Sequence, residues 1–544
     1  MAILFLIGLR FDLAMNRFWD EDEFRHLYRS YLFSQGQVPY RDFGYSFSPF
    51  LIAYFAPLFL FLKEGVTVLF LARALNFLVF LATLLVLFFI GDLAFNRLTG
   101  VVAAFFWAFL PLNLSKTIEI RPDNFALFFW LVSFLFLLMA ERKKRERLLL
   151  FLAGFTYGLA FLILMKVAFG YLGLLAVLLL ISRGGWKKIW QNFFLFHLGA
   201  LIPFLILFLM ALFWGNLIQT FYSVLLLPYE INRSHGKDFF SPIFPFIPND
   251  TFYGLGGLSL PWWLTILALF LGVIGLIKQA FQIISKGYRS TNLFLLFSFL
   301  GFAFLVFFFI YISLLQNYLP LLVILCLAAA IFLVELGCWL QKRSGLVWLV
   351  VCLLFFSLAC FGLWQSERIQ TQWKSTGQLQ VVQNILSVSE PGDSVYDMTG
   401  YHLYRQSGHF YCCETFPLFA HGLSQPFPDL PEELRKNQTK FIYWNKKKFW
   451  TLGTEDVSFL RQHYLPTGLT DLYVAGRQLI FSDNQEIVFE LLVRGEYQLE
   501  TKGQGRLIID GQEVKTNQVY LENGWHQARG EGIKELVLKS KLEE

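Results

Sequence analysis

Charged residues are scarce in this chain of 544 residues, since Asp, Glu, Lys and Arg together make up only 15% of it. Soluble domains average about 25% charged residues. The hydrophobic fraction is 56%, and 64 residues are phenylalanine. This composition excludes a soluble globular protein. Long apolar segments cross a membrane only as helices or closed barrels, and these segments show no strand-like alternation. We therefore expect an all-α polytopic membrane bundle.

Cysteine and histidine are also few, with six and eight residues respectively. No His or Cys spacing typical of a metal site occurs, and although paired carboxylates can bind a hard cation, nothing indicates one. We expect no cofactor. Because disulfide geometry disfavours a bridge between neighbours, the adjacent Cys412 and Cys413 are expected not to bridge each other. Pairing elsewhere and free thiols both stay open. The net charge of +6 comes from basic residues between apolar runs, a topology signal, so we expect no nucleic-acid partner.

Eleven segments are predicted to cross the membrane. The first is read as a retained span rather than a signal peptide, because it has neither a basic start nor a small-residue cleavage site. The predicted spans are residues 1–15, 68–91, 100–115, 123–140, 148–165, 167–182, 191–213, 259–278, 291–310, 318–337 and 345–364.

The apolar run 47–62 is shorter than the roughly 20 residues that a crossing needs. If it lies along the outer face, the basic loop at 142–147 falls inside, as the positive-inside rule requires. We therefore predict a juxtamembrane helix at 47–62. The acidic run near residue 20, the 215–258 loop and the region after 364 then all lie outside. The 215–258 loop reads as a lid. We expect a multi-pass bacterial inner-membrane protein with an extracytoplasmic C-terminal region.

Three domains are predicted: a transmembrane domain at 1–364, an α/β domain at 365–480 and a β-sandwich-like module at 481–544. An amphipathic helix at 366–390 and a strand at 440–444 mark the second. In the third, short strands alternate with turn signals at Gly495, Asp510-Gly511 and Asn523-Gly524. Two of its phrases resemble carbohydrate-binding or PA14-type sandwiches.

Four consecutive acids, Asp20 to Glu23, follow the first apolar segment. Such a cluster in a membrane protein is costly unless it faces water or a polar cavity. It is either a solvated loop that ends a helix or part of a site. Like-charge repulsion should raise the pKa of at least one of these carboxyls.

Further polar residues are predicted on the same outer face. Taken singly, each has an ordinary explanation, since Lys166 can be a snorkelling lysine and Asp123 can favour the start of a helix. Their common placement favours a site. A carboxylate there can take a proton from an acceptor hydroxyl or amine, and cations can hold a lipid phosphate as charge builds on it. The residues are Asp22, Glu23, Arg121, Asp123, Lys166, Gln316, Asn317 and Tyr318.

The ordered pattern resembles the GT-C glycosyltransferases of the ArnT-like and protein-mannosyltransferase superfamily. The resemblance covers about residues 1–340. Its pieces are Asp22-Glu23, Gly36, the run from Pro39 to Phe43, Ser48-Pro49, Arg121 to Asp123, the stretch ending at Lys166, and Tyr318 to Pro320.

The resemblance implies an inverting sugar transfer from a polyprenyl-phosphate-linked donor to a lipid, glycan or protein acceptor, without a metal. Asp22 would be the catalytic base and Asp123 the second acid, while Lys166, helped by Arg121, would grip the donor phosphate. Glu23 and Asp42 would shape the first outer loop, and Tyr318 and Gln316 would contact substrate. Because four acids stand in a row, Asp20 remains an alternative to Asp22.

Two other interpretations stay open. A transporter or lipid flippase predicts charges spread through the depth of the bilayer and an internal repeat, and the sequence shows neither. An O-antigen-type ligase or polymerase predicts a large loop rich in Arg and His, whereas the 215–258 loop holds only Arg233, His235 and Lys237 as such cations.

Overall fold

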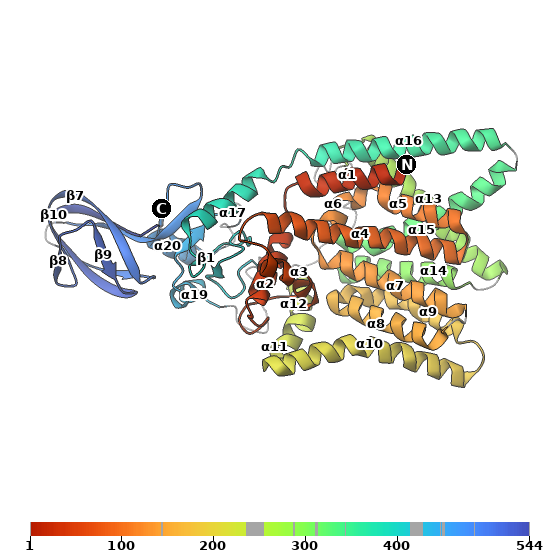
Figure 1. Cartoon of the computed structure of the whole chain (residues 1–544), viewed down its shortest axis with the longest axis horizontal. Helices are drawn as coiled ribbons and strands as arrows, with labels where there is room; N and C mark the ends of the chain where they lie inside the picture. Colours follow the sequence, from red (N-terminus) through yellow and green to blue (C-terminus); the bar gives the residue numbers. More distant parts are fainter. Residues whose placement is uncertain are drawn as a thin grey trace. The chain divides into compact units, whose positions relative to one another are not determined.

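The computed structural model describes residues 2–142, 145–234, 255–286, 289–310, 314–342, 344–413, 428–445, 448, 452–482 and 485–542 (Figure 1). The chain forms two compact units. We call residues 1–19, 46–51 and 69–375 the helical unit. The mixed unit consists of residues 20–45, 52–68 and 376–544. Residues 235–254 of the predicted lid lie outside the described residues.

The helical unit is built from apolar helices, as the composition predicts. Its main elements are α1 (Ala2–Asn16), α4 (Thr67–Ala94), α5 (Arg97–Phe109), η1 (Pro111–Asn113), α6 (Leu114–Ile118), α7 (Pro122–Glu141), α8 (Glu146–Ile163), η2 (Met165–Gly170), α9 (Tyr171–Ile181), α10 (Trp186–Trp214), α11 (Leu217–Phe221), η3 (Tyr222–Leu226), α12 (Leu227–Ser234), α13 (Leu260–Lys286), α14 (Ser290–Phe304), η5 (Leu305–Phe309), η6 (Leu315–Tyr318), α15 (Leu319–Gln341) and α16 (Gly345–Gln370). Helices α7, α8 and α10 run side by side (Figure 1).

Small residues allow these helices to approach closely. Gly154 and Gly158 of α8 face the backbone of α10 at Phe196 and Ala200, and a Cβ atom at either glycine would collide with a carbonyl oxygen there. Close backbone approach at small residues is the usual packing mode between helices in a membrane.

Within the described residues, eight helices are long and apolar enough to cross a membrane, or nine if the bent pair Arg97–Phe109 and Pro111–Ile118 counts as one span. The predicted count of eleven is therefore not confirmed. Helices α1 and α9, both predicted spans, have 15 and 11 residues. The apolar run 47–62 contains α3 (Phe50–Phe61), whose 12 residues are fewer than the roughly 20 needed to cross.

Prolines set the breaks that interrupt the helical unit. Leu110 and Arg121 each precede a proline and have extended ψ values of 113° and 144°, because a residue before proline avoids the helical region. The chain consequently bends by 59° between α5 and the η1–α6 segment. It leaves the helical conformation again just before α7. Polar side chains gather at these breaks.

The mixed unit combines helices with a ten-stranded sheet. Strands β2, β1, β3, β5, β10, β7 and β8 lie in that order, while β4 pairs with β5, β6 with β10, and β9 with β7. Its helices are α2 (Glu21–Ser34), α17 (Thr376–Val388), α19 (Leu430–Lys436) and α20 (Thr454–His463). Its strands are β1 (Ser394–Tyr396), β2 (Gln406–Ser407), β3 (Phe441–Tyr443), β4 (Tyr464–Pro466), β5 (Leu472–Ile480), β6 (Glu486–Leu491), β7 (Gly495–Ile509), β8 (Gln512–Val514), β9 (Gln518–Leu521) and β10 (Gly524–Ser540).

Strand β5 links the two predicted soluble domains. It pairs with β3 on one side and with β10 on the other, where Leu479 faces Leu536. One buried cluster includes Ile442 and Ala475, and a second includes Leu479 and Leu536. The sheet thus passes without interruption from one predicted domain to the next, over two separate cores. The predicted sandwich is not confirmed, and the boundary at 480 stays a prediction.

The expectation for the adjacent cysteines is wrong. Cys412 and Cys413 are joined to each other in a disulfide bond. Their Cα atoms are 3.8 Å apart, and Cys412 has a left-handed φ of 34°. Chain connectivity holds the pair closer than the roughly 4.4–6.8 Å common in disulfides, and the unusual backbone conformation accommodates the small ring.

Candidate functional site

The acidic run of the mixed unit begins helix α2. Asp20 is the N-cap, and its carboxylate accepts the Asp22 backbone amide at 3.0 Å. The Glu23 carboxylate accepts the Asp20 backbone amide at 2.9 Å and is fully buried. This is a capping box, which satisfies amides that the first helical turn leaves open. Asp20 and Glu23 therefore hold the start of α2 in place.

The other two acids of the run form ion pairs. Asp22 lies 3.0 Å from Arg25, and 27% of its side chain is exposed. Glu21 lies 2.5 Å from Lys448. Desolvation raises the pKa of Glu21, and the positive charge of Lys448 partly offsets this rise. The neighbouring carboxylates of Asp20 and Asp22 raise the same pKa further. Neighbouring acids therefore do raise one carboxyl pKa in the run, as the sequence predicts, although desolvation is the larger cause.

Asp42 belongs to the turn that follows α2. Its carboxylate accepts hydrogen bonds from Nε and Nη2 of Arg41, each at 2.9 Å. It also accepts one from the Val38 backbone amide at 2.7 Å. The hydrogen bond from Arg41, opposed by slight desolvation and reinforced by Val38, lowers the pKa of Asp42. Asp42 thus closes the turn, and its role in shaping the first outer loop of a catalytic site stays a prediction.

In the helical unit, one buried carboxylate gathers three cations. Glu119 lies 2.6 Å from Arg17, 2.7 Å from Lys116 and 2.7 Å from Arg121. All four side chains are at most 6% exposed. Asn124 ties the segment together by donating to the Glu119 and Lys116 carbonyls at 2.9 and 3.0 Å. Buried charges need such partners, because an isolated ion is very costly away from water.

A second charged group lies between the start of α7 and η2, the short helix that follows α8. Lys166, in η2, contacts the carboxylate of Asp123, which sits in the first turn of α7. Its ammonium also donates to the Gln316 carbonyl at 3.1 Å and the Asn317 side chain at 3.0 Å. Within the described residues, the buried Gln316 side-chain oxygen has no hydrogen-bond partner. Tyr318 ends η6, is the N-cap residue of α15 and is buried.

These two groups bring four cations and two carboxylates together in the helical unit, namely Arg17, Lys116, Arg121 and Lys166 with Glu119 and Asp123. The N-terminus of α7 adds a favourable helix dipole. Such a cluster is suited to an anion, and phosphate oxygens are strong acceptors for these donors.

The structure therefore brings together Arg121, Asp123, Lys166, Gln316 and Tyr318 in the helical unit. Asp22, Glu23 and Asp42 belong to the mixed unit. That both sets serve one site stays a prediction.

Sequence reasoning missed several buried cations. Arg10 lies in the middle of α1 and is fully buried; it donates to the Ala108 and Leu110 carbonyls and to Asn113 at 2.7, 3.1 and 2.5 Å. Arg73 of α4 similarly donates to the Ala14 carbonyl at 2.7 Å. An arginine inside an apolar run was the available signal, since such residues face polar partners in the protein interior. Glu119 had no such signal, because it stands in a short polar stretch.

No group of three or more His, Cys, Asp or Glu residues that could hold a metal ion occurs in the part of the chain that the structure describes. The prediction that the protein needs no metal stays a prediction.

Comparison with known proteins gives the fold. Residues 48–214 match the family of dolichyl-phosphate-mannose-protein mannosyltransferases. The structure resembles apo ArnT from Cupriavidus metallidurans, with a TM-score of 0.56 and 13% identity over 87% of this chain and 97% of that one. The chain has the GT-C fold of membrane glycosyltransferases. The resemblance to this superfamily predicted from the sequence is thus confirmed.

Two further similar structures contain bound lipid phosphates. ArnT bound to undecaprenyl phosphate matches with a TM-score of 0.53 and 14% identity over 75% of this chain and 84% of that one. The Archaeoglobus fulgidus oligosaccharyltransferase AglB, in complex with an inhibitory peptide and a dolichol-phosphate, matches with a TM-score of 0.51 and 12% identity over 100% and 97%. No curated protein matches the chain in sequence.

The family match includes the charged cluster of the helical unit except Arg17, but not the acidic run. Lys116, Glu119, Arg121, Asp123 and Lys166 fall inside residues 48–214, whereas the acids at the start of α2 precede them. Evidence for a role of the acidic run therefore comes from its own geometry.

Proposed function

We propose that the protein transfers a sugar, a hexose or a pentose, from a polyprenyl-phosphate-linked donor to a lipid, glycan or protein acceptor at the outer face of the membrane. The observation that carries this proposal is the buried cluster of cations and carboxylates at the breaks of a GT-C helical bundle. The family match and the lipid phosphates of the ArnT and AglB structures support it.

The donor phosphate is held by Lys166 with help from Arg121. Both already contact carboxylates at close range, which keeps their charges in place before a substrate arrives. As the bond between the sugar anomeric carbon and the phosphate oxygen breaks, its electron pair passes to the phosphate. Fixed cations stabilise that developing charge, an effect typically worth about 2.7–4 kcal/mol for each donor.

Asp22 is the base that takes the proton from the attacking acceptor hydroxyl or amine. Among the four acids, Asp20 and Glu23 are occupied in the capping box and Glu21 is paired with Lys448. The assignment to Asp22 rests on its place in the sequence pattern, and its side chain, 27% exposed, lies 3.0 Å from Arg25. In a single displacement the acceptor bonds to the anomeric carbon from the face opposite the phosphate, so the configuration inverts.

The decisive test replaces Asp22 with Asn and measures sugar transfer from a radiolabelled polyprenyl-phosphate sugar in membranes. Loss of a general base typically lowers the rate by about 10²–10⁴-fold. Glu455→Gln is a matched control, because Glu455 is also an exposed acid in the first turn of a helix of the mixed unit. Full activity in Asp22→Asn would overturn the base assignment, and full activity in Asp20→Asn as well would argue against any catalytic role of this run.

A further inference from the structure

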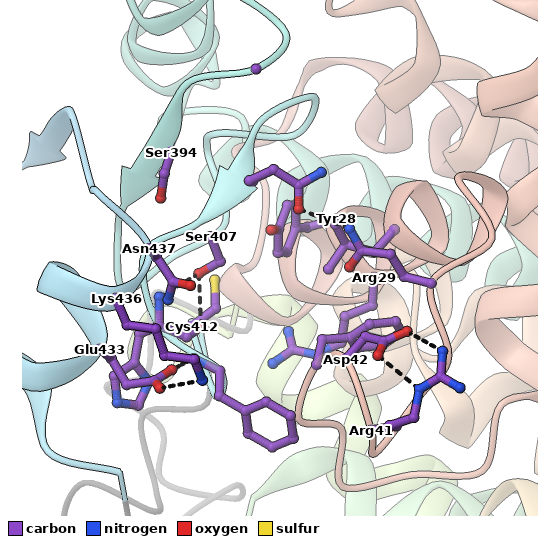
Figure 2. Close-up of a pocket in the computed structure, with 17 residues that line it drawn as sticks. Tyr28, Arg29, Arg41, Asp42, Ser394, Ser407, Cys412, Glu433, Lys436 and Asn437 are labelled. Carbon is purple, nitrogen blue, oxygen red and sulfur yellow. Dashed lines mark hydrogen bonds and ion pairs between the residues drawn. The ribbon is translucent and has the colours of Figure 1, made fainter. Parts of the chain in front are cut away.

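A polar cleft of about 560 Å³ lies entirely within the mixed unit (Figure 2). One wall comes from α2 and the turn after it, with Tyr28, Arg29 and Asp42. The opposite wall comes from β2 and α19, with Ser407 and Glu433. The volume falls in the range of about 300–1,000 Å³ typical of small-molecule sites.

Direct contacts hold the two walls together. The Gln37 amide donates to Gln406 at 2.8 Å, and Arg29 donates to the Tyr411 carbonyl at 3.2 Å. Away from the cleft, Arg405 lies 2.8 Å from Glu64. The cleft is therefore a formed feature of the unit, although its walls come from parts of the chain more than 340 residues apart.

The charges of the cleft compensate one another. Arg41 is paired with Asp42 at 2.9 Å, and Lys436 with Glu433 at 3.3 Å (Figure 2). Arg29 gives its hydrogen bonds to backbone carbonyls, including that of Gly44 at 2.7 Å. The net charge of the lining is therefore only +1, from three cations (Arg29, Arg41 and Lys436) and two carboxylates (Asp42 and Glu433). A phosphate or polyanion would have to compete with the acids already in place, so the cleft is not suited to one.

The remaining lining suits a neutral ligand rich in hydroxyl groups. The side-chain amides of Gln37, Gln406 and Asn437 line the cleft. Gln37 donates to the Gln406 oxygen and Asn437 donates to the Gly408 carbonyl, so the groups that can still bind a ligand include the Gln406 nitrogen and the Gln37 and Asn437 oxygens. A sugar hydroxyl likewise both donates and accepts. Phe43 and Phe410 add aromatic surface for the apolar C–H faces of a sugar ring. A lipid tail would instead leave these remaining amide atoms without partners, which is costly.

Helix α2 connects this cleft to the acidic run. Asp22 lies in its first turn, and Tyr28, six residues on, lines the cleft. With a rise of 1.5 Å per residue, that is about 9 Å along the helix. We propose that the cleft binds a neutral saccharide portion of the acceptor, which makes the acceptor a glycan or glycolipid. This inference rests on the proposed function.

An extended peptide is the competing ligand, since it could add a strand to the edge of the sheet at β2. That strand has only two residues, which offers few backbone hydrogen bonds for strand addition. The cleft therefore favours a saccharide over a peptide.

The test uses the full-length protein in lipid nanodiscs and measures binding by native mass spectrometry. The probes are neutral hexasaccharides of glucose, mannose and galactose, a hexasaccharide of galacturonic acid, inorganic phosphate and an extended hexapeptide. At least one neutral hexasaccharide should bind, and Gln406→Leu and Gln37→Leu should each weaken its binding by about tenfold. Gln380→Leu is the matched control, because this amide is exposed on α17 and lies outside the cleft lining. Thermal unfolding checks that each variant folds.

Binding of the peptide or acidic probe alone, binding unaffected by both cleft variants, or no saccharide binding would each overturn the inference. Transfer of sugar from a radiolabelled polyprenyl-phosphate donor, measured in membranes that contain the native acceptor, tests the proposed function separately. Sugar transfer without saccharide binding would refute the acceptor assignment and leave the proposed function in place. Saccharide binding in the cleft without sugar transfer would refute the proposed function and leave a saccharide site.

Discussion

Lys166 joins the ends of three segments of the helical unit, because its ammonium contacts Asp123, the Gln316 carbonyl and the Asn317 side chain. Replacing Lys166 with Met should lower sugar transfer by about 10²–10³-fold, since a cation at the leaving phosphate is lost. The same change leaves Asp123 buried without its cation, which typically destabilises by about 3–5 kcal/mol.

A double variant separates these two effects. Lys166→Met combined with Asp123→Leu removes both charges, so stability should recover while sugar transfer stays low. Thermal unfolding measures the stability of the double variant, and the membrane assay measures its sugar transfer. Lys278→Met serves as control, because Lys278 forms a similar ion pair with Glu335 at 2.7 Å but is 40% exposed. Recovery of transfer in the double variant would show that Lys166 acts only on folding.

At the scale of the element, helix α2 carries both the proposed base and one wall of the cleft, and Asp20 caps its start. Asp20→Ala should lower stability by about 0.5–2 kcal/mol, the usual effect of removing an N-cap. It should lower transfer far less than Asp22→Asn does, because the base itself remains. Thermal unfolding and transfer measured on both variants check this, and an equal loss of transfer would point to Asp20 as the base.

At the scale of the whole molecule, the predicted topology puts the loop 142–147 inside and everything after residue 364 outside, as the distribution of Lys and Arg requires. An alkaline phosphatase fused after residue 364 should therefore be active in a bacterial host, since this enzyme folds only outside the cytoplasm. A fusion in the 142–147 loop should be inactive. The reverse pattern would remove the acidic run from the outer face and with it the proposed reaction.

Much of the fold could be predicted from local pattern. Apolar runs predict helices because a membrane leaves the backbone no other partners, and the turn at Asp510 and Gly511, both with positive φ, lies where the sequence predicts it. The number of spans could not be predicted as well. Whether a short helix such as α9 crosses depends on its neighbours, and hydropathy alone carries no information on packing.

The candidate site, like the fold, could be predicted only in part from the sequence. Local sequence already singles out the acids of α2, Arg121 to Asp123 and Lys166, because they stand out against an apolar chain. Their partners come from the packing of the chain: Glu119 gathers cations from positions 17, 116 and 121, and Arg10 binds the carbonyls that a proline-induced break leaves open. Packing also forms the cleft from residues near 40 and near 400. Ionic and hydrogen-bonded pairing depends on distances in space, and these arise only once the helices have packed.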